Sequence, residues 1–185
     1  MRLENSFEVA APPEQAWALL IDVPRIIPCM PGAKLDETVD EANWKATVAV
    51  KLGPISLSFK TDVKREEADE AARHAKLSAK AREARGRGNA SATIESSLTP
   101  QDGGTRVDIV TDLQLTGAVA QYGRGLVQDV SSQLVTQFAD CLRAQLASSP
   151  AEAEAAVESQ SRPVGGLRLG LGALWRSLGR LFRRG

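Results

Sequence analysis

Residues 43–64 read NWKATVAVKLGPISLSFKTDVK, which is two runs of alternating side chains joined by a Gly-Pro pair. In the first run the even positions, from Trp44 to Leu52, are apolar or small, and lysine and threonine lie between them. In the second run the odd positions, from Ile55 to Val63, form the apolar set. Alternation with one polar face is typical of antiparallel strands that cover a core on one side. The segment therefore predicts a β-hairpin with one buried face.

The same alternation continues on both sides of this hairpin. NASATIESSLT at 89–99 and RVDIVTDLQLT at 106–116 predict two more strands, joined by the turn sequence PQDGG. Residues 2–10 predict a strand with Leu3, Asn5, Phe7 and Val9 on one side. Two prolines and an early glutamate in AAPPEQAWALLID predict a short helix, and DVPRIIPCMPGAK predicts at most a brief helix and then a turn.

The segment between these strands, REEADEAARHAKLSAKAREARGRG, fits two predictions. It is rich in good helix formers, and Ala68, Ala72, Ala75 and Ala79 have helical spacing. It also alternates, with Ala75, Leu77, Ala79 and Ala81 on one side. Propensity alone favours a helix for residues 66–85. The neighbouring strands favour a hairpin turn near Asp69 and a further strand, because sheet context can override propensity. We predict the strand.

The C-terminal part of the chain divides into a helix, a linker and a tail. Residues 117–149 contain no proline and place apolar side chains on one broad face, which predicts a helix of about 30 residues and roughly 45 Å. Residues 149–166 are rich in Ala, Glu and Ser and predict a flexible linker. The predicted domain organisation is a ligand-binding domain at 1–148, the linker at 149–166 and an amphipathic basic helix at 167–185.

The tail, LRLGLGALWRSLGRLFRRG, has no acidic residue from position 167 onward. At 100° per residue it forms an apolar stripe and an opposite basic face, the pattern of a helix at a membrane surface. Basic side chains near an anionic leaflet contribute about 1 kcal/mol each. Docking in the groove of a protein partner is the alternative. The predicted anchor residues are Leu167, Leu171, Leu174, Trp175, Leu178, Leu181 and Phe182 on the apolar face, and Arg176, Arg180, Arg183 and Arg184 on the basic face.

Composition limits the functional classes. Residues 1–148 carry 17 basic and 20 acidic side chains, a net charge of −3, whereas residues 149–185 carry 6 and 3, a net charge of +3. We therefore expect no nucleic-acid partner. We expect neither a signal peptide nor a membrane-spanning helix, which places the protein at the cytoplasmic face of the membrane. Cys29 and Cys141 are then expected to be reduced and structural. The single histidine, His74, is predicted on a polar strand face, so we expect no catalytic residues, metal site or catalytic cofactor.

The segments CMPGAKL, LGPISLSF, GRGNASATI, GGTRV and LTGAVAQYGRGLV carry a family resemblance. Residues 1 to about 147 resemble the small G-subunit proteins associated with molybdenum-containing carbon monoxide dehydrogenases. The resemblance implies an α+β START-like, or helix-grip, fold, in which an antiparallel sheet wraps around a long C-terminal helix and encloses an apolar cavity. It also implies an accessory protein, within a superfamily that binds lipids, sterols, polyketides or ubiquinone.

Small side chains on the inward faces of the predicted strands favour such a cavity. Ala46, Thr61, Ala81 and Ala90 are among them, and small residues leave interior volume unfilled. The alternative is a helix that lies closer to the sheet, so that alanines suffice. The predicted ligand-cavity residues are Trp44, Val48, Val50, Leu57, Phe59, Thr61, Val63, Leu77, Ile94, Ser96, Leu98, Ile109, Thr111, Leu113, Tyr122, Leu126, Val127, Val130 and Leu134.

Together these features lead to one functional hypothesis. The domain draws an isoprenoid quinone, menaquinone, from the bilayer and presents it to carbon monoxide dehydrogenase as electron acceptor. Thr61, Thr111, Ser96 and Tyr122 are unranked candidates for binding the head group. The alternatives are an accessory protein that recruits or matures the dehydrogenase at the membrane, a general lipid-binding protein, and, least favoured, an enzyme acting on a small apolar substrate.

Overall fold

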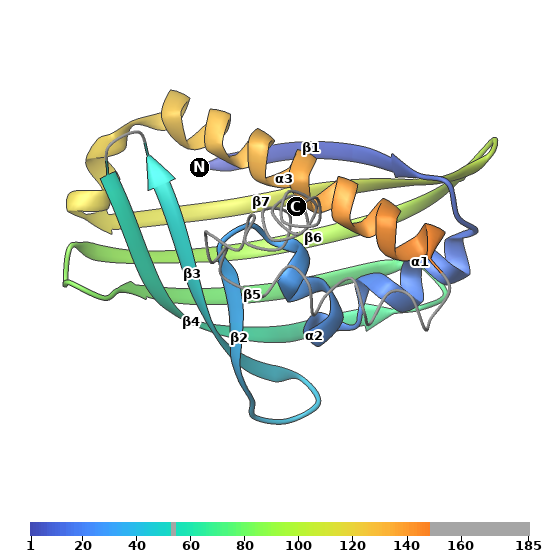
Figure 1. The fold of residues 1–185 in the computed structure, drawn as a ribbon, viewed down its shortest axis with the longest axis horizontal. Coiled ribbons are helices and arrows are strands. Elements are labelled where there is room, and N and C mark those ends of the chain that lie inside the picture. The colour runs from blue at the N-terminus through green and yellow to red at the C-terminus, as the bar shows by residue number, and fades with distance from the viewer. Residues whose placement is uncertain (53–54, 149–185) are drawn as a thin grey trace, which may run out of the picture. The chain divides into compact units, whose positions relative to one another are not determined.

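The alternating segments pair into one antiparallel sheet of seven strands, in the order β1-β7-β6-β5-β4-β3-β2 (Figure 1). The computed structural model describes residues 1–52 and 55–148. The strands are β1 (Arg2–Val9), β2 (Ala33–Thr38), β3 (Asn43–Leu52), β4 (Ile55–Asp69), β5 (His74–Glu83), β6 (Gly88–Gln101) and β7 (Gly104–Gly117). The helices are α1 (Pro13–Leu20), α2 (Val23–Ile26), η1 (Ile27–Cys29), η2 (Ala118–Tyr122) and α3 (Arg124–Ala147).

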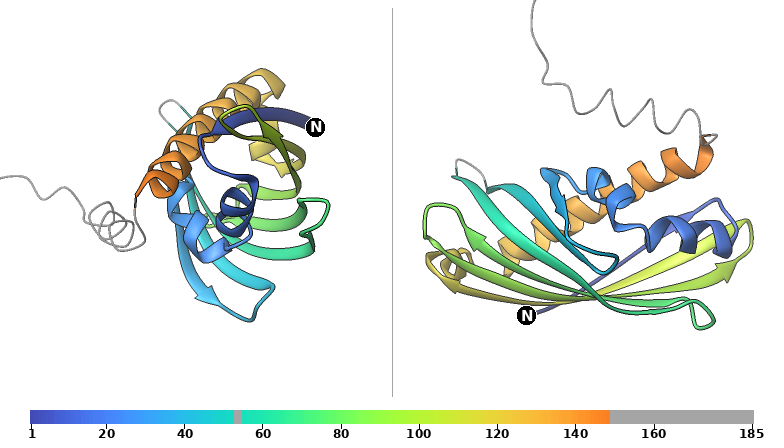
Figure 2. Two further views of the ribbon diagram at one scale, coloured as in Figure 1. Left: turned by 90° about the vertical axis from the view of Figure 1, so that its right-hand side faces the viewer. Right: turned by 90° about the horizontal axis from the view of Figure 1, so that it is seen from below.

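The sheet curls around the face on which α1, α2 and α3 lie (Figure 2). The predicted alternation decides which side chains face the helices. In β1, for example, Leu3, Phe7 and Val9 are buried, and the residues next to Phe7 and Val9 are not. This arrangement is the predicted helix-grip fold, with α3 packed across the inner face of the sheet.

The segment that fitted both a helix and a strand forms two paired strands. β4 runs to Asp69, a turn follows, and β5 begins at His74, so the predicted hairpin is confirmed. β5 pairs with β4 on one side and with β6 on the other. Hydrogen bonding to two neighbours along its length outweighs the helix propensity of its alanines and lysines. His74 lies half-buried on the outer face, with its Nδ1 3.6 Å from Glu67 Oε1.

One strand was missed, and one helix begins later than predicted. The strand β2 was not predicted, because AKLDET has too few apolar residues to show alternation. It is an edge strand that pairs with β3, and a register shift follows Leu35. The predicted helix from 117 is shorter, since Gly117 and Gly123 adopt φ of 75° and 76° and the segment between them is η2. α3 itself has 24 residues.

The core concentrates at one end of the sheet, where α1 and the C-terminal half of α3 cover it. Trp17, Phe138 and Leu142 are its large members, and the rings of Phe7 and Phe138 meet edge to face at 6.2 Å. We call this region the packed end; its buried residues are Phe7, Val9, Ala16, Trp17, Leu19, Leu20, Cys29, Ala75, Leu98, Val107, Ile109, Phe138, Ala139 and Leu142.

A disulfide between Cys29 and Cys141 joins η1 to α3 at the packed end. The prediction that both cysteines are reduced is therefore wrong. That prediction rested on an expected intracellular compartment. The two residues are 112 positions apart in the sequence. In the fold η1 lies against the last turns of α3, and the two Cα atoms are 5.3 Å apart, within the range of disulfides. Gln145 Nε2 also lies 3.1 Å from Cys29 Sγ.

Candidate ligand cavity

An apolar cavity of about 300 Å³ lies at the other end of the same sheet, beneath the N-terminal half of α3. We call this region the cavity end. Every strand except β2, together with η2 and α3, contributes to its wall. The lining residues are Leu3, Val48, Val50, Leu57, Phe59, Thr61, Ala81, Ala90, Thr111, Leu113, Leu115, Val119, Val127, Val130, Ser131 and Leu134.

The cavity exists because a row of small side chains crosses the middle of the sheet. Ala46, Thr61, Ala81 and Ala90 occupy paired positions on four neighbouring strands. At the packed end, by contrast, Ala75 meets the large side chains of the core that includes Trp17 and Phe138. The small inward residues therefore leave a cavity at one end of the sheet. At the packed end large side chains fill the space above them.

The side chains of the wall can bind an apolar molecule but offer little acid–base chemistry. Three hydroxyl groups are the only polar side-chain groups among the described lining residues, on Thr61, Thr111 and Ser131. Ser131 Oγ accepts a hydrogen bond from Asn5 Nδ2 at 3.4 Å. No titratable side chain lines the cavity within residues 1–52 and 55–148. The same described residues contain no cluster of His, Cys, Asp or Glu that could hold a metal ion.

A buried carboxylate, Glu83, lies at the end of β5, at the β5–β6 turn and directly opposite Phe59 of the cavity wall. Glu83, only 2% exposed, accepts hydrogen bonds from the Arg87 guanidinium at 2.9 Å and from the backbone N–H groups of Arg85 and Arg87 at 2.8 and 3.1 Å. The hydrogen bond from the Arg87 side chain is the main reason that the pKa of Glu83 falls to about 2. Arg87 also donates to the Ser56 carbonyl oxygen on β4. This network holds the turn against the strand that carries Leu57.

Close backbone contact at the same turn requires a glycine. Gly88 has a φ of 142°, and a Cβ atom there would lie 2.0 Å from the Thr116 carbonyl oxygen and 2.9 Å from a methyl carbon of Val119. Val119 is itself 2% exposed and packs with Leu57 and Phe59. The tight approach of β6 to the end of β7 thus holds Val119 against Leu57 and Phe59 in the cavity wall.

The structure brings together ten of the predicted cavity residues. They lie on β3, β4, β7 and α3, where the alternation and the helical spacing were clearest. These residues are Val48, Val50, Leu57, Phe59, Thr61, Thr111, Leu113, Val127, Val130 and Leu134.

The other predicted cavity residues lie elsewhere. Trp44 packs with Val23 and Ile27 in a separate cluster, and Val63 and Leu77 lie beside that cluster. The Arg65 guanidinium carbon is 5.6 Å from the centroid of the Trp44 ring. Leu98 and Ile109 belong to the packed end, Ile94 packs against it, and Ser96 is buried between Ala75 and Ile109 on the neighbouring strands. Leu126 is 39% exposed. The side chain of Tyr122, the linker at 149–166 and the predicted anchor at 167–185 lie outside the described residues.

Six lining residues were not predicted as cavity residues. Leu3, Ala81, Ala90 and Leu115 follow the inward alternation of their strands, so the pattern contained their signal. Ser131 lies among the apolar positions of α3. Val119 lies in η2, where sequence periodicity gives no signal.

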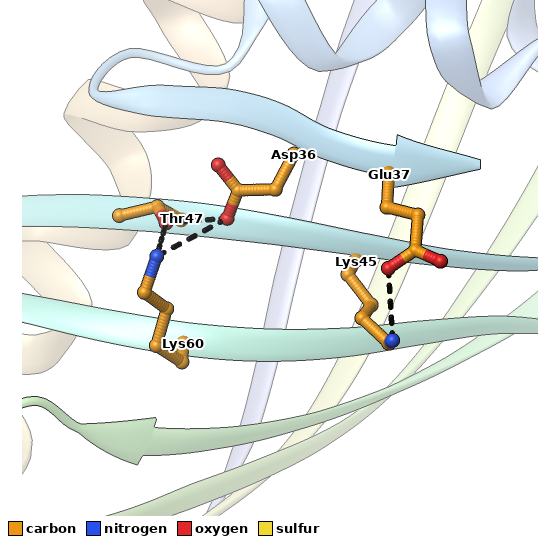
Figure 3. A network of polar contacts seen from close by, with 5 residues as sticks. All are labelled: Asp36, Glu37, Lys45, Thr47 and Lys60. Atoms are coloured by element: carbon orange, nitrogen blue, oxygen red, sulfur yellow. Dashed lines mark hydrogen bonds and ion pairs between the residues drawn. The ribbon is translucent and has the colours of Figure 1, made fainter. Parts of the chain in front are cut away.

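A second, larger hollow of about 870 Å³ lies across the outer face of the sheet. Charged residues dominate its rim, including Asp36, Lys45, Lys60, Lys80 and Arg82. Thr47 Oγ1 donates to Asp36 Oδ2 at 2.6 Å and accepts from Lys60 Nζ at 2.8 Å, while Lys45 lies 2.9 Å from Glu37 (Figure 3). These exposed polar contacts tie β2 to β3 and β4, and their contribution to stability is small.

The sequence profile of the family described as the carbon monoxide dehydrogenase G subunit (CoxG) matches residues 6–147. The chain belongs to this family. The CoxG match covers almost the whole folded domain, including every cavity-lining residue except Leu3. No curated protein matches the sequence at a significant level.

Solved structures show the fold that this CoxG chain shares. A conserved protein from Geobacillus kaustophilus has a TM-score of 0.71 at 22% identity, over 80% of this chain and 95% of its own. The Zhui aromatase/cyclase from Streptomyces sp. R1128 has a TM-score of 0.55 at 14% identity, over 90% and 99%. A START superfamily protein from Mycobacterium smegmatis has 0.53 at 14%, over 78% and 96%. These similarities confirm the START-like fold.

The family and the fold agree with the coarse prediction made from the sequence. CoxG is an accessory subunit, and the START-like fold is a ligand-binding fold. In this chain the apolar cavity lies between the sheet and α3. None of the helices within the described residues is long and apolar enough to cross a membrane.

Proposed function

We propose that this CoxG domain carries an isoprenoid quinone, menaquinone, between the cytoplasmic membrane and a molybdenum-containing carbon monoxide dehydrogenase. The observation that carries the proposal is the apolar cavity at the cavity end. A quinone is an uncharged ring with two carbonyl oxygens and an apolar tail. A wall of aliphatic side chains with a few hydroxyl groups matches that chemistry, and it disfavours charged ligands, whose burial without a partner is costly.

The volume of the cavity agrees with a bicyclic head group. A cavity of about 150 Å³ accommodates benzene, and small-molecule sites begin at roughly 300 Å³. The cavity here, at about 300 Å³, has room for two fused rings. The isoprenoid tail would extend from it along the apolar face of α3, where Val127, Val130 and Leu134 are half-buried and Leu126 is exposed.

The family and the sequence of the tail support the delivery step of this proposal. Electrons from carbon monoxide oxidation must reach the respiratory chain, and a soluble dehydrogenase has poor access to a quinone dissolved in lipid. The basic amphipathic segment at 167–185 would hold the protein at an anionic membrane surface. A linker of about 18 residues reaches on the order of 20–25 Å as a flexible coil, so the domain could shuttle while the tail stays bound.

Ligand analysis tests the carrier function directly. The purified full-length protein is extracted with organic solvent, and the extract is analysed by mass spectrometry; the stripped protein is then incubated with menaquinone-loaded vesicles. We expect menaquinone in the extract and uptake from the vesicles. Ala81→Leu, which fills the cavity, should abolish uptake, while Ala144→Leu on the exposed side of α3 should take up menaquinone normally.

Other outcomes would separate the alternatives. Phospholipid or fatty acid in the extract, with no quinone uptake, would replace the quinone carrier with a general lipid-binding protein. An empty cavity in a protein that still binds vesicles and the dehydrogenase would indicate a recruiting or maturation factor.

The membrane step has its own test. A variant truncated after Gly166 should no longer co-sediment with vesicles that contain anionic lipid, whereas the full chain should co-sediment. Binding should weaken with added salt, because the arginine contribution is electrostatic. Unchanged co-sedimentation of the truncated protein would remove the tail from the mechanism and leave the cavity proposal standing.

A further inference from the structure

Thr61 is a buried hydroxyl residue in the wall of the cavity. It lies in the middle of β4, is 8% exposed, and lines the cavity beside Phe59 and Ala81. Its Oγ1 has no hydrogen-bond partner among residues 1–52 and 55–148. Buried hydroxyl groups are normally hydrogen-bonded, so an unpaired one inside an apolar wall needs an explanation.

Packing alone does not explain a threonine at this position. Inward positions nearby on β3 and β4 carry valine, at Val48, Val50 and Val63. Valine has nearly the same shape as threonine and no polar group to desolvate. A buried hydroxyl without a partner destabilises the folded state relative to that apolar equivalent.

The surroundings offer the hydroxyl no alternative partner. The backbone of β4 is paired to β3 on one side and to β5 on the other throughout this region. The cross-strand neighbours of Thr61 are Ala46 and Ala81, whose methyl groups can neither donate nor accept. Because no hydrogen bond fixes the side chain, a rotation about χ1 that exchanges the hydroxyl and the methyl group breaks no polar contact.

The other two hydroxyl groups of the cavity differ from Thr61. Ser131 Oγ already accepts from Asn5. Thr111 is only half-buried, so water can satisfy its hydroxyl group. Of these three residues, Thr61 is therefore the one whose hydroxyl group is left for an oxygen atom of a ligand.

We propose that Thr61 is the residue that binds the polar head of the cavity's ligand. Its Oγ1 turns into the cavity and hydrogen-bonds to a ring oxygen. A hydroxyl group can both donate and accept, so the same residue donates to the carbonyl of a quinone and accepts from the hydroxyl of the reduced quinol. The inference rests on the proposed quinone-binding function, and it ranks Thr61 above the other three candidates from the sequence.

Binding of two small probes to the purified protein tests the proposal. Menadione, 2-methyl-1,4-naphthoquinone, carries both oxygens, and 2-methylnaphthalene has the same rings without them. The quantity to compare is the preference, defined as the affinity for menadione divided by the affinity for 2-methylnaphthalene. Thr61→Val should lower this preference about five- to tenfold relative to wild type, the effect of one neutral hydrogen bond, while still binding 2-methylnaphthalene. Thr61→Ser should retain the wild-type preference.

A matched control and a folding measurement keep the result interpretable. Thr93→Val makes the same change on the outer face of β6 and should leave the preference unchanged. Thr61→Val should melt at or above the wild-type temperature, because it removes an unpaired hydroxyl. If Thr61→Val keeps the wild-type preference, the Thr61 inference is overturned and cavity binding stands. If wild type binds neither probe, the proposed function itself fails.

Discussion

The two ends of the sheet share the strands β1, β5, β6 and β7 and the long helix α3, but one end is packed and the other is hollow. At the packed end Trp17, Phe138 and Leu142 fill the space between sheet and helices, and a disulfide joins α3 to η1. At the cavity end the row that includes Thr61, Ala81 and Ala90 leaves about 300 Å³ unfilled. The difference shows that one sheet can concentrate stability in one half and leave the other half free to bind.

Removing the disulfide should give the largest loss of stability. Replacing both Cys29 and Cys141 with serine releases a cross-link between residues far apart in sequence, and loss of such a bond costs about 2–5 kcal/mol. Chemical denaturation measures this change. Menaquinone binding at the cavity end should persist under conditions where the variant is folded. A variant that is folded but no longer binds would show that the two ends are coupled.

The same substitution, leucine to alanine, can be made on α3 at each end of the sheet, and the two losses of stability can be compared. Leu142→Ala removes a side chain that is 2% exposed and should cost about 2–5 kcal/mol. Leu134→Ala removes a half-buried side chain that already borders a void, and it should cost about 1 kcal/mol or less. Urea unfolding of both variants gives the comparison. Equal losses would contradict the division into a packed end and a cavity end.

A second matched pair adds volume on β5. Ala75→Leu overpacks the packed end and should cost about 1–3 kcal/mol while leaving menaquinone uptake unchanged. Ala81→Leu enters the cavity, so it should change stability by less than about 1 kcal/mol and reduce uptake strongly. Thermal melting and vesicle uptake, measured on both variants, separate the two effects. A large destabilisation by Ala81→Leu would mean that the cavity has no room for added atoms.

Acid should act on the cavity end through Glu83. Its folded-state pKa of about 2 lies below the ordinary value of 4.5, so ionised Glu83 stabilises the fold above pH 4.5. That contribution is lost as the pH falls from 4.5 through about 2. The melting temperature of wild type should therefore decline in this window, and Glu83→Gln should start lower and decline less. Glu70→Gln, in the exposed turn before β5, is the control that should follow wild type.

The sequence predicted the parts of the fold in which periodicity repeats. Alternation placed β3, β4, β6 and β7 and oriented their side chains correctly, and sheet context identified β5. β2 was missed because AKLDET shows no clear alternation of apolar and polar residues. It is a strand because it pairs with β3. The early start predicted for α3 ignored Gly123, whose positive φ separates η2 from the helix.

The cavity residues were predicted only in part, because the sequence does not show where the helices lie on the sheet. Alternation says that Trp44, Ile94 and Thr61 all face inward, but it does not say which helix covers each one. α2 covers Trp44, the packed end takes in Ile94, and only Thr61 meets the void. The Cys29–Cys141 bond was missed because the expected compartment favoured reduced thiols, and its pairing depends on where η1 meets α3 in space.

The attachment of α3 also determines how the cavity can change its width. Near its C-terminal end the helix is held by the disulfide, by Arg143 Nε to the Glu8 carbonyl oxygen at 2.8 Å, and by Gln145 to the Arg25 carbonyl oxygen at 3.3 Å. Its first turn has no side-chain cap. Arg124 lies 17 residues before Cys141 on α3, about 26 Å along the helix axis, so a rotation of about 5° around Cys141 would move the first turn by about 2 Å. A small change in the angle of α3 around Cys141 would therefore change the size of the molecule that fits beneath its N-terminal half.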